Sequence, residues 1–137
     1  MGELIRFGVS LEDALLKKFD ELNDKKGYTN RSEAIRDLIR AELVREEWES
    51  GKEVVGAVSI IYDHHKRELL NKIVDMQHDY QPLILSTMHI HLDHDNCLET
   101  IIVKGESSAV KKFYEKMRAV KGVKHADIAF TTLGKAL

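Results

Sequence analysis

The stretch MHIHLDHDNCLE, residues 88 to 99, contains the only cysteine and three of the seven histidines of this 137-residue chain. Histidines alternate with apolar residues in its first part, so an extended strand would send His89 and His91 out of one face, about 7 Å apart. The polar residues Asp93 to Asn96 are typical of a turn, and the apolar run Leu98 to Val103 predicts a returning strand. The stretch therefore predicts a β-hairpin with two imidazoles on one face.

The place of Cys97 depends on the length of the hairpin loop. A three-residue loop would set Cys97 opposite His91 and Glu99 opposite His89, all on one face. A two-residue loop would pair Leu92 with Cys97 and turn the sulfur to the other face. Because imidazole and thiolate are ligands for borderline and soft metal ions, a metal site here requires the three-residue loop.

The same register leads to an expectation for the core. It places several apolar side chains on the face opposite the histidines: Met88, Ile90, Leu92, Leu98 and Ile102. We expect this face to pack against the rest of its domain.

In the alternative to a metal site, the two histidines are solvated strand residues and Cys97 is a small buried hydrophobic residue.

A site that holds a metal without water needs a fourth ligand, and His78 is the candidate. It ends a helical pattern from Lys66 to Asp79, and Pro82 stops that helix before a strand from Leu83 to Leu92. His91 would lie about 26 Å along that strand, so one chain is not expected to close the site. A second copy, packed on the histidine face, would then supply His78. Alternatively, His78 is an exposed residue at a helix C-terminus.

The composition limits the class of protein. The net charge of −2 does not by itself indicate a nucleic-acid partner, and a single cysteine fits a reducing cytosol. No apolar run approaches the ~20 residues of a membrane span, and the first residues do not resemble a signal peptide. No glycine-rich phosphate loop, nucleophile elbow or HExxH motif occurs. We therefore expect a cytoplasmic protein that is not an enzyme.

The first fifty residues predict a strand followed by two helices. Apolar residues at 5, 7 and 9 alternate with Arg6, Gly8 and Ser10, and Asn30 is a typical N-cap for the second helix. A lone strand leaves its backbone unpaired, so we expect it to pair with the same strand of a second chain. The paired strands would present Arg6, Gly8 and Ser10 to a major groove.

The start of the second helix would offer Asn30, Arg31 and Ser32 to a phosphate. Residues 1 to 50 contain nine Lys or Arg against twelve Asp or Glu, so DNA contact must depend on local placement. A dimerisation module that does not touch DNA is the alternative.

Beyond Gly51, the order strand-helix-strand-strand-helix-strand predicts a ferredoxin-like βαββαβ domain with both helices on one face. Its turn Asp63-His64-His65 is either solvated or binds a second metal ion more weakly. We expect His94 to be solvated.

The string GYTNRSEAIRD at residues 27 to 37, the strings DHHKREL at 63 to 69 and QH at 77 to 78, and the hairpin together resemble the nickel-responsive transcriptional regulator family. The resemblance implies an α+β fold: a ribbon-helix-helix domain over 1–50 for DNA binding and dimerisation, and an ACT-type domain over 51–137 for metal binding and tetramerisation. It also implies Ni(II) ligands His89, His91 and Cys97 in one chain and His78 from another. Glu33 and Asp37 match a secondary cation position. Gln77 and Glu99 are expected to anchor the ligands.

The implied function is a repressor of nickel-uptake genes that binds a double-stranded operator as a homotetramer. Three imidazole nitrogens and one thiolate in a plane suit Ni(II) or Cu(II) better than Zn(II). A zinc or copper sensor on the same scaffold and an ACT-type small-molecule-responsive regulator are the alternatives. In either metal case, we hypothesise that metal and DNA favour the same arrangement of the assembly, so that each raises the affinity for the other.

Overall fold

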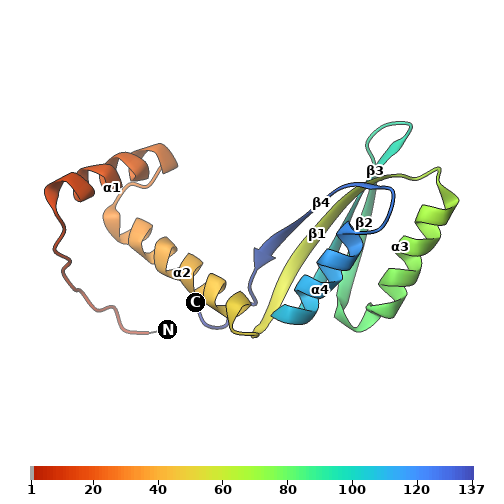
Figure 1. Ribbon diagram of the computed structural model, residues 1–137. Coiled ribbons are helices and arrows are strands. Elements are labelled where there is room, and N and C mark those ends of the chain that lie inside the picture. Colours follow the sequence, from red (N-terminus) through yellow and green to blue (C-terminus); the bar gives the residue numbers. More distant parts are fainter. Residues whose placement is uncertain (1) are drawn as a thin grey trace. The chain divides into compact units, whose positions relative to one another are not determined.

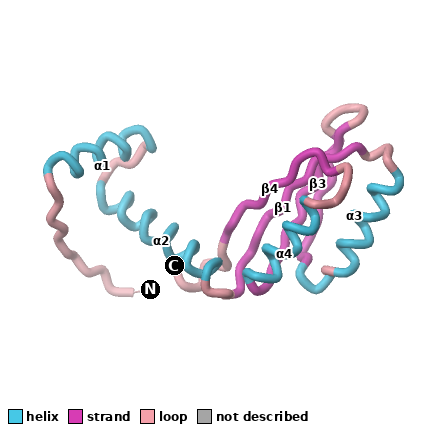
Figure 2. The backbone as a smooth tube through the Cα atoms, in the orientation of Figure 1, coloured by secondary structure: helices cyan, strands magenta, loops and turns pink. Residues whose placement is uncertain are grey.

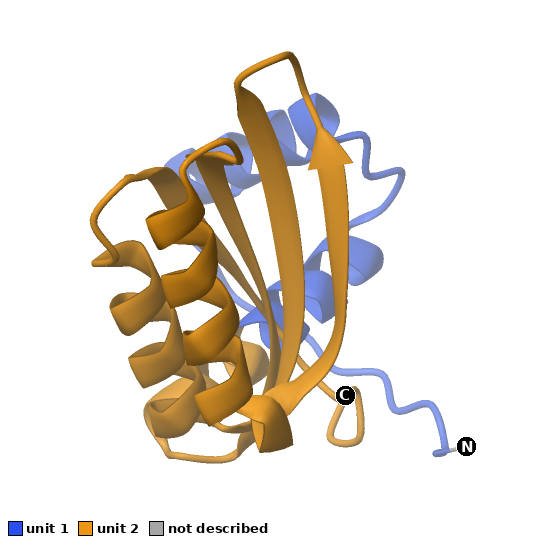
Figure 3. Ribbon diagram, turned by 90° about the vertical axis from the view of Figure 1, so that its right-hand side faces the viewer, with its two compact units in different colours: residues 1–41 blue, residues 42–137 orange. Residues whose placement is uncertain are grey.

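The structure is a computed structural model that describes residues 2 to 137. These residues form two compact units, one that ends at Ala41 and one from Glu42 to Leu137, which Figure 3 shows in different colours. Among the described residues, no helix is both long enough and apolar enough to cross a membrane.

The first unit contains α1, Asp13–Lys26, and most of α2, Arg31–Glu49. Gly27 ends α1 with a φ of 81°. Glycine adopts this left-handed conformation at little energetic cost because it has no Cβ atom. The Oδ1 atom of Asn30 accepts the backbone N–H of Glu33 at 2.9 Å, which confirms Asn30 as the N-cap of α2.

The strand expected near residues 5 to 9 is not formed in this single chain. Residues 2 to 12 have no regular secondary structure and are drawn as loop in Figure 2. Ile5, Phe7 and Val9 are 82%, 70% and 60% exposed. A β-strand exists only through its hydrogen-bonded neighbour, and one chain provides none here. The segment therefore leaves a row of apolar side chains in solvent.

The second unit is a sheet covered by two helices (Figure 1). Its elements follow in the order β1 (Glu53–Asp63), α3 (Arg67–Asp79), the 3₁₀ turn η1 (Gln81–Leu83), β2 (Ile84–His91), β3 (Asn96–Glu106), α4 (Ser107–Arg118) and β4 (Val123–Thr131). The four strands lie in the order β2-β3-β1-β4, and all neighbours are antiparallel. This topology confirms the predicted α+β fold with a ferredoxin-like domain.

The core lies between the sheet and the two helices, which cover the same face (Figure 3). Alternate residues of β1 and β3 are buried, and Phe113 and Met117 of α4 are fully buried against them. Trp48, at the end of α2, belongs to this core: its indole Nε1 donates to the carbonyl of Thr131 at 2.8 Å. The end of α2 is therefore part of the second unit.

The expectation for the core face of the hairpin was wrong. Met88, Ile90 and Leu92 are 58%, 43% and 51% exposed, whereas Cys97 and Glu99 lie on the buried side. Alternation along a strand fixes which residues share a face, but not which face the helices cover. Both faces of this hairpin carry apolar residues, and the helices cover the face shared with the histidines.

A β-bulge also breaks the alternation along β2. The pairing of β2 with β3 shifts between Ile84 and Ser86, so the residues before the shift and those after it differ in parity. Leu85 lies within the bulge and is 61% exposed. The apolar pattern of β2 therefore cannot be read as one continuous face.

Candidate metal centre

The hairpin has the register that a metal site requires. His91 pairs with Cys97 and His89 pairs with Glu99, so the side chains of all four leave one face of the sheet. The amide of Leu92 donates to the carbonyl of Asn96 at 2.9 Å and closes the three-residue loop. The predicted register is thus confirmed.

A hydrogen-bond network fixes the position of Glu99, a buried carboxylate that is only 5% exposed. The hydroxyl of Tyr62 donates to Glu99 Oε1 at 2.9 Å, and the side-chain amide of Gln77 donates to Glu99 Oε2. Tyr62 is also 2.5 Å from His89 Nε2. A buried carboxylate needs such partners, since leaving it unpaired is costly. Gln77 and Glu99 therefore hold α3 against the hairpin beside His89.

No signal in the sequence indicates a role for Tyr62 at this site. It lies on β1, opposite Cys97 in the pairing of β1 with β3. Burial, followed by the charge of Glu99, raises the pKa of Tyr62 well above its usual range, which keeps its hydroxyl protonated and able to donate. Only the register between two strands that lie far apart in the sequence could have placed it there.

Cys97 is fully buried at this point of the sheet. Burial raises the pKa of its thiol, a hydrogen bond with Tyr62 lowers it, and the charge of Glu99 raises it further, so that the net direction is upward. Tyr62 therefore lies beside both Cys97 and His89. The thiol shares its surroundings with the imidazole side of the hairpin and is not turned to the opposite face.

His78 lies in the last turn of α3, directly after Gln77, and is exposed. Within residues 2 to 137, no three of the four expected ligands His78, His89, His91 and Cys97 bring their ligand atoms within 4.8 Å of one another. The hairpin aligns three of these residues on one face, but the single chain does not gather a closed site.

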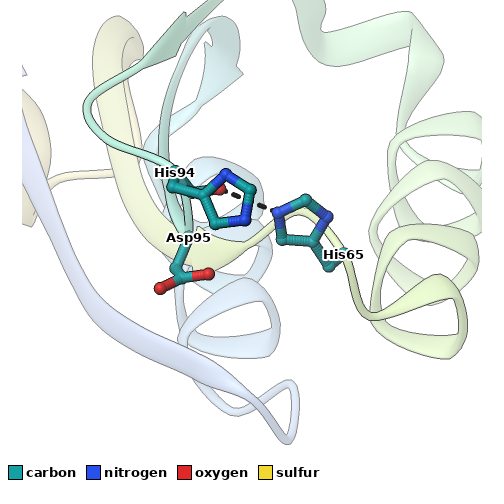
Figure 4. Close-up of side chains that lie close together, drawn as sticks. All are labelled: His65, His94 and Asp95. Carbon is teal, nitrogen blue, oxygen red and sulfur yellow. Dashed lines mark hydrogen bonds between the residues drawn. The ribbon is translucent and has the colours of Figure 1, made fainter.

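A different cluster does gather in the second unit. His65, from the turn after β1, meets His94 and Asp95 at the hairpin tip, and one ligand atom from each lies within 4.8 Å of the other two (Figure 4). Sequence analysis treated His94 as solvated and left His65 open. No local pattern links the two residues, because the pairing of β1 with β3 brings their loops together.

The expected DNA contacts lie in the first unit. Arg6, Gly8 and Ser10 are exposed in the extended segment before α1. Arg31 forms an ion pair with Asp20 through two hydrogen bonds of 2.9 and 2.8 Å, so a phosphate would have to compete for its guanidinium. Ser32 is exposed beside it in the first turn of α2.

Glu33 and Asp37 are one helical turn apart on α2, so their carboxylates lie on the same side of the helix. Asp37 accepts the hydroxyl of Tyr28 at 2.6 Å, and Glu33 accepts that of Thr29 at 3.5 Å. The hydrogen bond to Asp37 raises the pKa of Tyr28. Two oxygen ligands are thus available on one helix side.

Comparison with known proteins identifies both parts of the chain. The NikR C terminal nickel binding domain matches residues 55–131, and the ribbon-helix-helix proteins of the copG family match residues 5–46. An uncharacterized protein from Thermotoga maritima shares the fold, with a TM-score of 0.52 at 10% identity, covering 57% of this chain and 96% of that one.

Curated relatives match over the full length. A protein of Syntrophus aciditrophicus is 53% identical, covering 98% of both chains. One of Geotalea uraniireducens is 51% identical and one of Geobacter metallireducens 50% identical, each covering 100% of this chain and 99% of its own. All three are named as candidate nickel-responsive regulators. This chain therefore belongs to the nickel-responsive regulator family, which consists of ribbon-helix-helix transcription regulators and not of enzymes.

Proposed function

We propose that this protein is a nickel-responsive repressor, acting in the cytoplasm on the operators of nickel-uptake genes. The observation that carries this proposal is the hairpin register, which pairs His91 with Cys97 beside His89 in the domain that matches a nickel-binding family. In this proposal, residues 1–50 bind DNA and dimerise, and residues 51–137 bind metal and tetramerise.

The residues on the hairpin fit a nickel ion by their chemistry. Two imidazoles and one thiolate from His89, His91 and Cys97 are donors that Ni(II) accepts, and His78 of a neighbouring chain would complete a planar set. When bound, the ion would supply coordination bonds to ligands from two chains. Glu99 and Tyr62 contact the ring of His89 and would hold it in place, as partners of metal-bound histidines commonly do.

The exposed face of the sheet supports assembly. Met88 and Ile90 are 58% and 43% exposed on β2, whose pairing places them on the face of the sheet away from the helices. Apolar patches of this kind are typical of surfaces that another chain covers. A homotetramer built as a dimer of dimers would bury this face, whereas His78 of one chain would reach the hairpin of another on the side where His89, His91 and Cys97 lie.

The N-terminal segment supports pairing of two chains at the DNA. A ribbon formed by two copies would cover Ile5, Phe7 and Val9 and expose Arg6, Gly8 and Ser10 to a major groove. The start of α2, with Asn30, Arg31 and Ser32, would contact the backbone phosphates. Glu33 and Asp37 would bind a secondary cation beside this head.

The mechanism we propose is thermodynamic linkage. Nickel bound across two chains selects one arrangement of the tetramer, and operator DNA selects the same arrangement. Each ligand then raises the affinity for the other by the same factor. Repression would follow when nickel is plentiful and the arrangement that fits the operator is populated.

A mixing experiment tests whether the ligands come from two chains. His78→Ala and Cys97→Ala proteins, each deficient in nickel binding, are expected to regain binding when unfolded together and refolded. Each mixed pair contains one intact site, formed by Cys97 of one chain and His78 of the other. Nickel stoichiometry by equilibrium dialysis measures the recovery.

The matched control mixes His89→Ala with Cys97→Ala. Both ligands are assigned to the same chain, so every site in a mixed pair lacks one of them and no recovery is expected. Equal recovery in the two mixtures, or none in the first, would contradict the shared site.

Substitution of Arg6 tests the ribbon as the DNA reader. Arg6→Ala is expected to weaken operator binding by about 10-fold or more, since a lost base contact costs roughly 1–3 kcal/mol. Operator duplexes selected from random DNA by the nickel-loaded protein serve as the probe, and mobility shift measures affinity. Lys18→Ala, an exposed change on α1, is the control. Operator binding unchanged in Arg6→Ala would count against the ribbon.

A further inference from the structure

The tip of the hairpin lies against the turn that follows β1, and three metal-ligating side chains meet there (Figure 4). His65, His94 and Asp95 each offer one ligand atom, and these atoms all lie within 4.8 Å of one another. All three side chains are exposed. None of them belongs to the ligand set assigned to nickel.

Hydrogen bonds hold the two loops in place without any ion. At the hairpin tip, Asp93 Oδ1 accepts the backbone N–H groups of Asp95 at 2.9 Å and of Asn96 at 2.8 Å. In the other loop, Asp63 Oδ1 accepts the backbone N–H of His65 at 2.9 Å. The His65 ring also reaches across, with Nε2 2.8 Å from the carbonyl oxygen of His94. The ligands are therefore carried on two fixed turns.

The neighbouring His64 lies between this cluster and the nickel hairpin, with its ring centroid 4.5 Å from that of His91. Its Nδ1 atom is shielded from solvent and has no hydrogen-bond partner among the described residues. Its ring centroid is 4.1 Å from that of His65, whose ring is 5.0 Å from that of His94. A row of imidazoles at these distances places several nitrogen ligands side by side on the surface.

The donor set selects a class of ion. Two imidazole nitrogens and one carboxylate oxygen suit divalent transition metals, whereas Mg²⁺ and Ca²⁺ prefer oxygen ligands alone. Three protein ligands leave at least one position for water or for another ligand. The carboxylates of Asp63 and Asp93 add negative charge nearby, and the cations closest to them include Lys66 and Lys124, which donates to Asn96.

We propose that His65, His94 and Asp95 form a second, surface site for a divalent transition-metal ion such as Zn(II) or Ni(II), separate from the thiolate site. Each chain provides this site alone, in contrast to the site completed by His78. It binds more weakly, because its ligands are exposed and fewer. The chain then takes up a second equivalent of metal once the first site is filled.

Zinc titration of the full-length Cys97→Ala protein tests this site with the thiolate removed. We expect one equivalent of zinc per chain to depend on His94, so that adding His94→Ala weakens its binding by at least about 10-fold in isothermal calorimetry. The matched control adds His125→Ala, an exposed histidine with Asp127 at 4.0 Å. That variant is expected to bind zinc like its parent.

Imidazole nitrogen shifts recorded by NMR in the same titration should move first for His65 and His94. Circular dichroism checks that each variant is folded. Zinc binding unaffected by His94→Ala, or no zinc bound by Cys97→Ala, would overturn the proposal. Because no step requires nickel or the thiolate, failure of the shared nickel site leaves this test independent.

Discussion

Replacement of Cys97 by alanine is expected to weaken nickel binding by more than about 100-fold and to remove thiolate-to-nickel charge-transfer absorption. Partners that only support a ligand already contribute about 10- to 100-fold to metal affinity, and loss of a ligand itself should cost more. A thiolate is also the donor that distinguishes this set from ordinary surface histidines. Nickel titration followed by visible and near-ultraviolet absorption measures both effects.

The comparison for this prediction is Gln77→Ala, which removes a hydrogen bond to Glu99 but no ligand. It should lower nickel affinity by about 10- to 100-fold and leave the charge-transfer band in place. A band that survives in Cys97→Ala would exclude the thiol as a ligand. Absence of any band in the unchanged protein would instead favour an ACT-type regulator that responds to a small molecule.

Two neighbouring isoleucines on β3 should respond differently to the same substitution. Ile101 is fully buried under the helices, so Ile101→Ala is expected to lower the free energy of unfolding by about 2–5 kcal/mol. Ile102 lies on the opposite face and is only partly buried. Ile102→Ala should therefore lower the free energy of unfolding of one chain by less, and it should mainly weaken the association of chains into an oligomer. Urea unfolding at several protein concentrations separates the two.

The reverse order of effects, with Ile102→Ala the more destabilising at low protein concentration, would show that the helices cover the other face. Stability that depends on protein concentration for Ile102→Ala but not for Ile101→Ala would support burial of the exposed face in an oligomer. Size-exclusion chromatography provides the matching measurement of assembly.

Local signals predicted most of the elements and the hairpin register. The turn residues around Asp93 specify a short loop, and of the two loop lengths that the sequence leaves open, the three-residue loop required by a metal site is the one that places Cys97 opposite His91. The helical spacing before Pro82 predicted α3 with its end at Asp79. In both cases, the deciding interactions lie within a few residues of one another.

The remaining features depend on contacts between distant segments. Tyr62 reaches the candidate metal centre only because β1 pairs with β3, and His65 meets His94 for the same reason. Which face of the hairpin is covered depends on where α3 and α4 pack, which alternation within the hairpin does not specify. The strand near Phe7 requires a second chain, so no single-chain structure can form it.

The buried carboxylate of Glu99 connects two histidines of the same chain: His89, which would bind the chain's own nickel ion, and His78, which would bind the nickel ion of a neighbouring chain. One oxygen is held by Tyr62 beside His89, and the other by Gln77, the residue before His78. In the proposed assembly, a displacement of the His89 ring would be transmitted through Glu99 to His78, and from there to the next subunit. Loading curves steeper than those of independent sites should result, with a Hill slope above unity that Glu99→Gln reduces.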